Sequence, residues 1–265
     1  AHVSCLAEQA KILWEEAEEN NLGAKAKNER WERWAVCSLC EQDYHGVVSC
    51  ALGWACWKMY LGRPEADQTR RMAMNLLGLG LHDAGRREDA LTVQEAELAM
   101  KRRLGVSEES MLAVQNNLAS TYEVIGRHEE ALNLYRDVYS GELILYGAAH
   151  EQTIISASNY ADSLIGLQRF KEAKALFRKT IPVARRVLGE SNELTLGMRS
   201  AYAGTLCLDT DATLDDLREA ATSLEETERI ARRVLGSAHP DVSSMENALQ
   251  EARAALAARE GTKIN

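Results

Sequence analysis

The chain has 265 residues, contains only 3 Pro and 2 Phe, and carries a formal net charge of −9 at pH 7. Acidic residues outnumber basic ones by 40 to 31, which disfavours nucleic-acid binding because proteins contact phosphates mainly through lysine and arginine. No apolar run approaches the ~18 residues that cross a membrane, and the first residues lack the pattern of a signal peptide, so we expect no membrane insertion. Six cysteines without a secretory signal indicate the cytoplasm or another reducing compartment.

Residues 1–25 are predicted to form an N-terminal capping helix over 3–19, which stops near Gly23. An end helix of this kind would cover the exposed core of the helices that follow. Apolar residues on one face of this helix are Val3, Leu6, Ala10, Leu13 and Ala17.

Residues 26–67 show the least regular helical pattern. We expect one helix over 28–42 and a second over 43–62. Large rings at i, i+3 spacing are expected to fill the core between these helices, and a recognition surface is the alternative. These rings belong to Trp31, Trp34, Trp54 and Trp57.

The same segment supplies five soft metal ligands, Cys37, Cys40, His45, Cys50 and Cys56. A C-x2-C pair begins many zinc sites, but the second half lacks a C-x2-C or H-x3-H partner. We therefore expect buried structural cysteines and no cofactor, because cysteine is a common small core residue. Zinc binding and redox chemistry are the alternatives.

A loop motif, Gly after Leu or Tyr, recurs at Gly62, Gly105, Gly147, Gly189 and Gly236, at intervals of 42 to 47 residues. A fixed period of this size indicates a solenoid, in which each unit buries its apolar face against its neighbours. The predicted array covers 26–242, with units at 26–67, 68–110, 111–152, 153–194 and 195–242.

Unit 111–152 shows the pattern of one repeat most clearly. Leu118, Ala119 and Tyr122 follow helical spacing, and the pattern resumes after a break with Ala131 and Tyr135. This predicts a helix, a tight turn and a second helix. The last unit has five extra residues around 208–216, between its two helices.

Residues 243–265 are predicted to form a C-terminal capping helix and tail. The helix spans 242–259. His239 lies in the loop before this helix, and His150 lies at the equivalent position in the loop before unit 153–194. We expect both histidines to cap helices or to form turns. Apolar residues on one face of the capping helix are Val242, Met245, Leu249, Ala252 and Leu256.

The repeat pattern resembles the tetratricopeptide repeat (TPR), which combines an aromatic residue, Leu-Gly, Tyr and Ala-x3-aromatic at helical spacing. The 42-residue period and the sequence Leu-Gly-x2-His-Pro at 235–240 are similar to the repeat subclass of kinesin light chains. The resemblance implies an all-α fold, a right-handed αα superhelix of about five helical hairpins with capping helices. It also implies a non-enzymatic scaffold or adaptor that binds a protein or peptide partner in a concave groove lined by the first helices.

Counting back from the second-helix alanines places Asn117 and Asn159 at equivalent groove positions. In this family an Asn here commonly contacts a peptide's backbone or terminal carboxylate, since an amide both donates and accepts hydrogen bonds. No lysine or arginine aligns with them, so we expect an internal neutral or basic segment; hydrogen bonding between helices is the alternative role. The remaining expected groove residues are Asn75, Val114, Asn116, Ser120, Glu123, Ile155, Ser158 and Asp162.

No catalytic motif is present, and the Gly-rich stretch 78–85 lies within a helical pattern, so we expect no enzyme. Two alternatives to the adaptor function stay open. One is a structural or assembly subunit of a larger complex, held through its convex face and caps. The other is a zinc-binding module that uses the region from Cys37 to Cys56.

Overall fold

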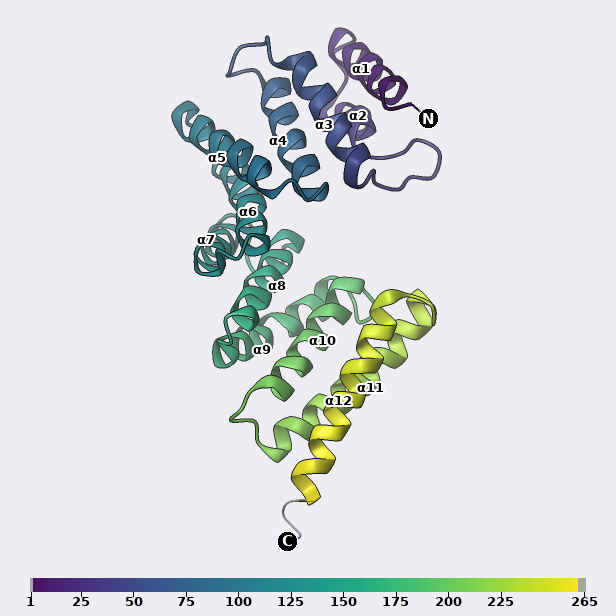
Figure 1. Ribbon diagram of the computed structural model, residues 1–265, viewed down its shortest axis with the longest axis vertical. Coiled ribbons are helices and arrows are strands. Elements are labelled where there is room, and N and C mark those ends of the chain that lie inside the picture. Colours follow the sequence, from purple (N-terminus) through teal and green to yellow (C-terminus); the bar gives the residue numbers. More distant parts are fainter. Residues whose placement is uncertain (1, 262–265) are drawn as a thin grey trace. The chain divides into compact units, whose positions relative to one another are not determined.

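The computed structural model describes residues 2–261, which form twelve α-helices and one 3-10 helix, so the predicted all-α fold class is confirmed (Figure 1). None of these helices is both long enough and apolar enough to span a membrane. The chain divides into two compact units, unit 1 from Ala1 to Arg127 and unit 2 from His128 to Asn265, and each is described by itself.

Unit 1 combines an end helix and an irregular first hairpin with three regular helices. Its elements are α1 Val3–Glu19, α2 Ala24–Trp31, η1 Glu32–Trp34, α3 Gly46–Tyr60, α4 Gln68–Asp83, α5 Arg87–Leu104 and α6 Glu108–Val124. Within this unit α3 packs against α4, α4 against α5, and α5 against α6. Unit 1 is therefore a stack of consecutive antiparallel helices.

Unit 2 is built in the same way, with each helix packed on its successor. Its elements are α7 His128–Tyr146, α8 Glu151–Gly166, α9 Phe170–Val187, α10 Glu193–Leu208, α11 Leu214–Leu235 and α12 Pro240–Gly261. The boundary between the two units divides the predicted repeat 111–152, because α6 belongs to unit 1 and α7 to unit 2.

Small residues lie where first and second helices cross. In unit 2, Ala161 and Ala173 are fully buried in the pair α8 and α9, and Ala203 and Ala220 are fully buried in the pair α10 and α11. A small side chain lets two helix backbones approach, so larger neighbours can interlock around the crossing. These alanines are the positions that the repeat pattern singles out.

The recurring loop ends one helix and begins the next. Gly105 has the left-handed conformation, φ 60°, that ends α5. The next helix then begins with a side chain that accepts a backbone N–H: Ser107 for α6, and Asn192 for α10. His150 Nδ1 accepts from Gln152 N at 3.2 Å, so its predicted capping role is confirmed.

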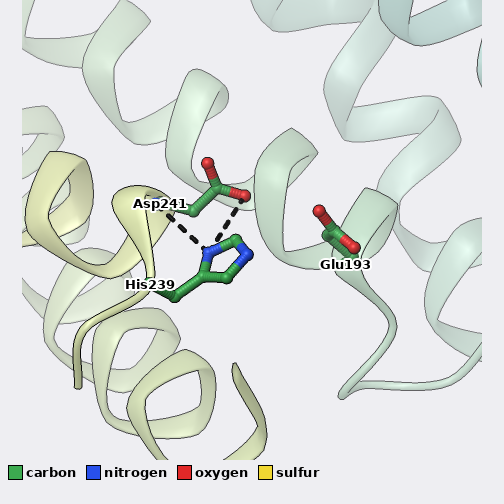
Figure 2. A group of neighbouring side chains, drawn as sticks. All are labelled: Glu193, His239 and Asp241. Atoms are coloured by element: carbon green, nitrogen blue, oxygen red, sulfur yellow. Dashed lines mark hydrogen bonds and ion pairs between the residues drawn. The ribbon is translucent and has the colours of Figure 1, made fainter. Parts of the chain in front are cut away.

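His239 has the same role before α12. Its Nδ1 accepts from the backbone N–H of Asp241 at 3.3 Å (Figure 2). The loop sequence is repeated because each copy performs the same two tasks, ending a second helix and capping a first helix.

The structure corrects the prediction of a helix over 28–42. The α2 helix ends at Trp31, η1 covers only three residues, and residues 35–45 form a loop with an isolated bridge between Val36 and Asp43. The only large apolar side chain within 37–43 is Leu39, which is 93% exposed. A helix here would therefore have had no apolar face to bury.

The tryptophans form the core of the first layers, as expected. The ring centroid of Trp31 lies 4.9 Å from that of Trp14 and 6.3 Å from that of Trp34, which is 1% exposed. Trp54 and Trp57 are partly buried against the next cluster, around Leu77 and Leu81. Trp14 was absent from the predicted apolar face of α1, yet it is buried, whereas Leu13 is partly exposed.

Two glycines bring α3 and α4 unusually close. A Cβ at Gly80 would lie 2.7 Å from Ser49 O and 3.0 Å from Cys50 Cα. A Cβ at Gly53 would lie 3.0 Å from both the backbone oxygen of Leu76 and the Cα of Leu77. Each glycine faces the backbone of the other helix, so neither position has room for a side chain.

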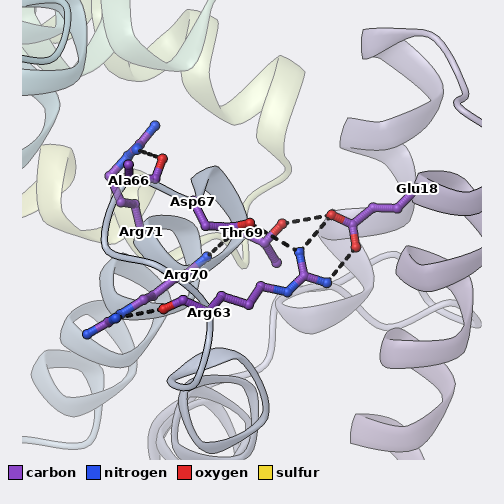
Figure 3. A network of polar contacts seen from close by, with 7 residues as sticks. All are labelled: Glu18, Arg63, Ala66, Asp67, Thr69, Arg70 and Arg71. Carbon is purple, nitrogen blue, oxygen red and sulfur yellow. Dashed lines mark hydrogen bonds and ion pairs between the residues drawn. The ribbon is translucent and has the colours of Figure 1, made fainter.

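The end helix α1 is anchored to the loop between α3 and α4 by polar contacts (Figure 3). The Glu18 carboxylate accepts hydrogen bonds from both terminal nitrogens of Arg63, at 2.9 and 2.7 Å, and one from Thr69 Oγ1 at 3.0 Å. The Arg63 hydrogen bond is the main reason that the pKa of Glu18 is lowered. In the same loop Asp67 caps α4 by accepting from Arg70 N.

The C-terminal helix α12 buries the predicted face. Val242, Met245, Leu249 and Ala252 are all buried. Leu256 is only partly buried. The helix covers α11 and part of α10, so it closes the core at its end of unit 2.

Candidate functional site

Asn75 is the predicted groove residue of α4, and its side chain forms a hydrogen bond inside unit 1. Its Nδ2 donates to Glu97 Oε2 at 3.5 Å. Glu97 is fully buried and forms an ion pair with Lys101 at 2.9 Å. Burial raises the pKa of Glu97, against the opposing influence of Lys101. Asn75 therefore fits the alternative expectation, a hydrogen bond between neighbouring helices.

Of the groove residues predicted on α6, one is buried in the core and the others are accessible at the surface. Val114 is fully buried, so the prediction that it contacts a peptide is wrong. It lies one turn before Asn117, on the side of α6 that packs inward. Asn116, Asn117, Ser120 and Glu123 are partly exposed and form the accessible polar face of α6.

On α8 the same separation appears. Ser158 is 8% exposed and belongs to the interior, which corrects its predicted place in the groove. Ile155 and Asn159 are partly exposed, and Asp162 is exposed. Although Asp162 is accessible to solvent, protein atoms surround its carboxylate, and this partial desolvation raises the pKa of Asp162 to about 6. We refer to the accessible residues Ile155, Asn159 and Asp162 as the α8 face.

The sequence comparison of first helices missed a basic residue on α10. Arg199 is 5% exposed and makes ion pairs with Glu226 at 2.5 Å and Glu190 at 3.5 Å. It lies one position before Ser200, which follows Ser158 of α8 by 42 residues. Its pairing satisfies the charge within unit 2, so Arg199 does not provide an open anion site.

The insertion at 208–216 has its carboxylates already engaged. Asp209 contacts Lys174 of α9 at 2.6 Å, and Asp211 contacts Lys171 at 3.0 Å. Thr213 and Asp216 form a capping box at the start of α11. The loop therefore fastens α9 to the α10–α11 connection.

The five predicted soft ligands do not form one metal site. Cys37 and Cys40 lie in the 35–45 loop, whereas Cys50 and Cys56 are buried in α3 within two different core clusters. His45 is the residue before α3 and does not cap it with its side chain. Among the described residues no three of these five lie within metal-ligand reach of one another. The alternative zinc site is therefore not assembled in the part of the chain that the structure describes, and the expectation of buried structural cysteines holds for Cys50 and Cys56 but is wrong for Cys37 and Cys40.

A different group of potential ligands lies between the starts of α10 and α12 (Figure 2). The ligand atoms of Glu193, His239 and Asp241 lie within 4.8 Å of one another. Nδ1 of His239 already accepts the capping hydrogen bond, and carboxylates in a first helical turn are favoured by the helix dipole. Helix capping accounts for all three residues. Sequence reasoning missed the group because its members come from separate repeats.

Comparisons with known proteins agree with this architecture. Residues 110–186 match the family model described as tetratricopeptide repeat. A clustered mitochondria protein homolog from Debaryomyces hansenii is 32% identical over 76 residues, which are 29% of this chain and 6% of that protein. The chain therefore matches only a small part of that relative.

Two solved structures resemble most of the chain in fold. BtubC (BKLC) from P. vanneervenii has a TM-score of 0.61 at 14% identity, covering 82% of this chain and 90% of that one. A kinesin light chain-like protein of Podospora anserina with nearly identical TPR-like repeats has a TM-score of 0.60 at 17% identity, covering 88% and 97%. At these identities the likeness concerns the fold alone.

Proposed function

Because this chain is a tetratricopeptide repeat protein, we propose that it is a non-enzymatic scaffold that holds a segment of a partner protein against its first helices. Proteins of this class are generally interaction scaffolds. The observation that carries the proposal is one accessible asparagine on a first helix of each unit, Asn117 on α6 of unit 1 and Asn159 on α8 of unit 2. Both are partly exposed at equivalent positions of α6 and α8, 42 residues apart.

The chemistry of these faces favours an extended, neutral or basic segment. A side-chain amide can donate to a peptide carbonyl and accept from a peptide N–H at the same time. Glu123 on α6 and Asp162 on the α8 face add negative charge, and the chain as a whole carries −9. Ile155 supplies an apolar contact on α8, whereas Val114 is excluded by its burial.

Affinity capture with matched variants tests this proposal. Wild type, Asn117→Ala/Asn159→Ala and Asn133→Ala are compared as baits at equal folded concentration, and bound proteins are identified by mass spectrometry. Asn133 is an exposed asparagine on the second helix α7, so it controls for the loss of an amide elsewhere. Partners should be lost from the double variant and kept by Asn133→Ala. Recovery of the same partners by all three baits would refute binding through the first helices.

A peptide from a recovered partner then allows a direct measurement. Calorimetric titration should give weaker binding to the double variant than to Asn133→Ala. For a basic peptide, affinity should fall as the pH drops through about 6, because Asp162 then loses its charge. Asp162→Asn should remove this part of the pH dependence.

The outer face of α1 favours a second candidate function, that of an assembly subunit held through its end. The side of α1 that faces away from the core is an open surface formed by Ser4, Cys5, Glu8, Gln9, Ile12 and Leu13. Ile12 is 46% exposed. If this face mediates assembly, Ile12→Asp should release the partners that the Asn117→Ala/Asn159→Ala variant retains.

A further inference from the structure

The loop 35–45 places two cysteines in one tight turn. Cys37 N donates to Gln42 O at 2.9 Å, and Glu41 N donates to Cys37 O at 3.0 Å. Glu41 adopts the left-handed conformation, with φ 57°, which reverses the chain after Cys40. These backbone hydrogen bonds close the turn that contains Cys37 and Cys40.

The two thiols of this turn belong to residues three positions apart, within the turn that the Glu41 N–H to Cys37 O hydrogen bond closes. The backbone N–H groups of Cys40 and Leu39, and the side chains of Cys40 and Tyr44, lower the pKa of the Cys37 thiol. The backbone N–H of Cys40 is the leading reason that the pKa of Cys37 is lowered to about 7. Both cysteines are free, Cys40 is exposed and Cys37 is partly exposed.

Each of the other cysteines is either buried or partly buried, or lacks a second cysteine close to it in the chain. Cys50 and Cys56 are buried, and burial raises the pKa of the Cys56 thiol. Cys207 is partly buried, and burial raises the pKa of its thiol as well. Cys5 is exposed on α1, far along the chain from any other exposed thiol. Reaction with a small disulfide requires an accessible thiolate, and closure to an internal disulfide requires a second thiol next to it.

We propose that Cys37 and Cys40 form a redox-active dithiol that exchanges with low-molecular-weight disulfides and closes to an internal disulfide. The Cys37 thiolate attacks one sulfur of the disulfide RSSR, so that a Cys37–SR bond forms and one thiolate RS⁻ leaves. Cys40 then gives up its proton and attacks the Cys37 sulfur, which expels the second RS⁻. The protein loses two electrons and two protons, and RSSR becomes two RSH.

Redox titration of the full chain with glutathione tests the proposal. The reduced protein is equilibrated in mixtures of reduced and oxidised glutathione, quenched with acid, alkylated and digested with trypsin. Mass spectrometry should find a disulfide between Cys37 and Cys40 within the peptide 34–58. Cys5 should carry at most one glutathione, because it has no second thiol to displace it.

The dependence of the oxidised fraction on total glutathione concentration distinguishes an internal disulfide from a mixed disulfide. Closing an internal disulfide releases two glutathione molecules for each oxidised one consumed, whereas a mixed disulfide releases one. A tenfold dilution of the buffer at fixed ratio should therefore raise the ratio of oxidised to reduced Cys37–Cys40 about tenfold and leave Cys5 unchanged.

The variant Cys40→Ser should trap glutathione on Cys37, and Cys5→Ser should behave as wild type. Circular dichroism of each variant establishes that it is folded. Two results would overturn the proposal: separate glutathione adducts on Cys37 and Cys40 in the wild type, or an oxidation state of this pair that does not respond to dilution.

Discussion

Replacing Gly80 by alanine should loosen the contact between α3 and α4. The added Cβ would lie 2.7 Å from Ser49 O, where ordinary van der Waals contacts begin at 3.4 Å. The atoms that it meets belong to the backbone of α3, so the clash can be relieved only by moving the two helices apart. Overpacking of this kind costs about 1–3 kcal/mol of the free energy of unfolding.

A second, opposite contribution comes from the change in helix propensity. Alanine is better than glycine inside a helix by about 0.5–1 kcal/mol. Gly197 on α10 isolates this contribution, because it is exposed and a Cβ there would meet no atom within 4 Å. Gly197→Ala should therefore stabilise unit 2 by about 0.5–1 kcal/mol, while Gly80→Ala should destabilise unit 1 by about 1–2 kcal/mol.

Urea unfolding can follow the two units with different probes. All 5 tryptophans lie in unit 1, so their fluorescence reports the unfolding of that unit. Circular dichroism reports both units and serves for the Gly197→Ala control. If Gly80→Ala raised the fluorescence midpoint as a simple gain of helix propensity would, the close approach of α3 and α4 would be refuted.

Three further substitutions test individual contacts. Glu18→Gln removes the charge that accepts two hydrogen bonds from Arg63 and should cost unit 1 about 1–3 kcal/mol. Because the pKa of Glu18 is lowered in the fold, the difference between wild type and variant in urea titrations should be complete above the ordinary pKa of 4.5 and should shrink as the pH falls below it. Lys174→Met leaves Asp209 without its positively charged partner. The hydrogen bond from Lys174 lowers the pKa of Asp209, so the variant should have a lower free energy of unfolding than wild type above about pH 4 and should approach wild type in acid. Unfolding followed by circular dichroism measures this difference. His150→Ala should lower the melting temperature through the loss of about 1 kcal/mol of helix capping, whereas His150→Asn should not; equal melting temperatures for the two variants would contradict the capping role.

The repeat architecture could be predicted from sequence because its signals are local. The period of the loop glycines and the small residues at helix crossings depend on neighbouring positions within one hairpin. Apolar spacing along the chain likewise predicted the end helices α1 and α12 well. The loop over 35–45 was predicted as a helix because its segment contains apolar residues, but these residues do not form one continuous helix face. The close approaches of α3 and α4 at Gly53 and at Gly80 depend on how the two helices are aligned, and the pattern of a single helix does not contain this information.

The candidate site could be predicted only in outline. Spacing placed Asn117 and Asn159 on partly exposed helix faces, but it could not decide where each face meets the core. Val114 and Ser158 are buried because neighbouring helices cover them. Arg199 was passed over because its acidic partners lie on other segments of the chain.

The side chains that begin the first helices act only within their own helix starts. The accepting side chain is Asp67, Ser107, His150, Asn192 or His239, and each accepts from a backbone N–H two or three residues further along the chain. Because such a cap needs no contact with another repeat, each first helix carries its own start signal. Substitution of one capping residue for another is therefore a local change, which leaves the packing between neighbouring repeats to the buried residues of the helices.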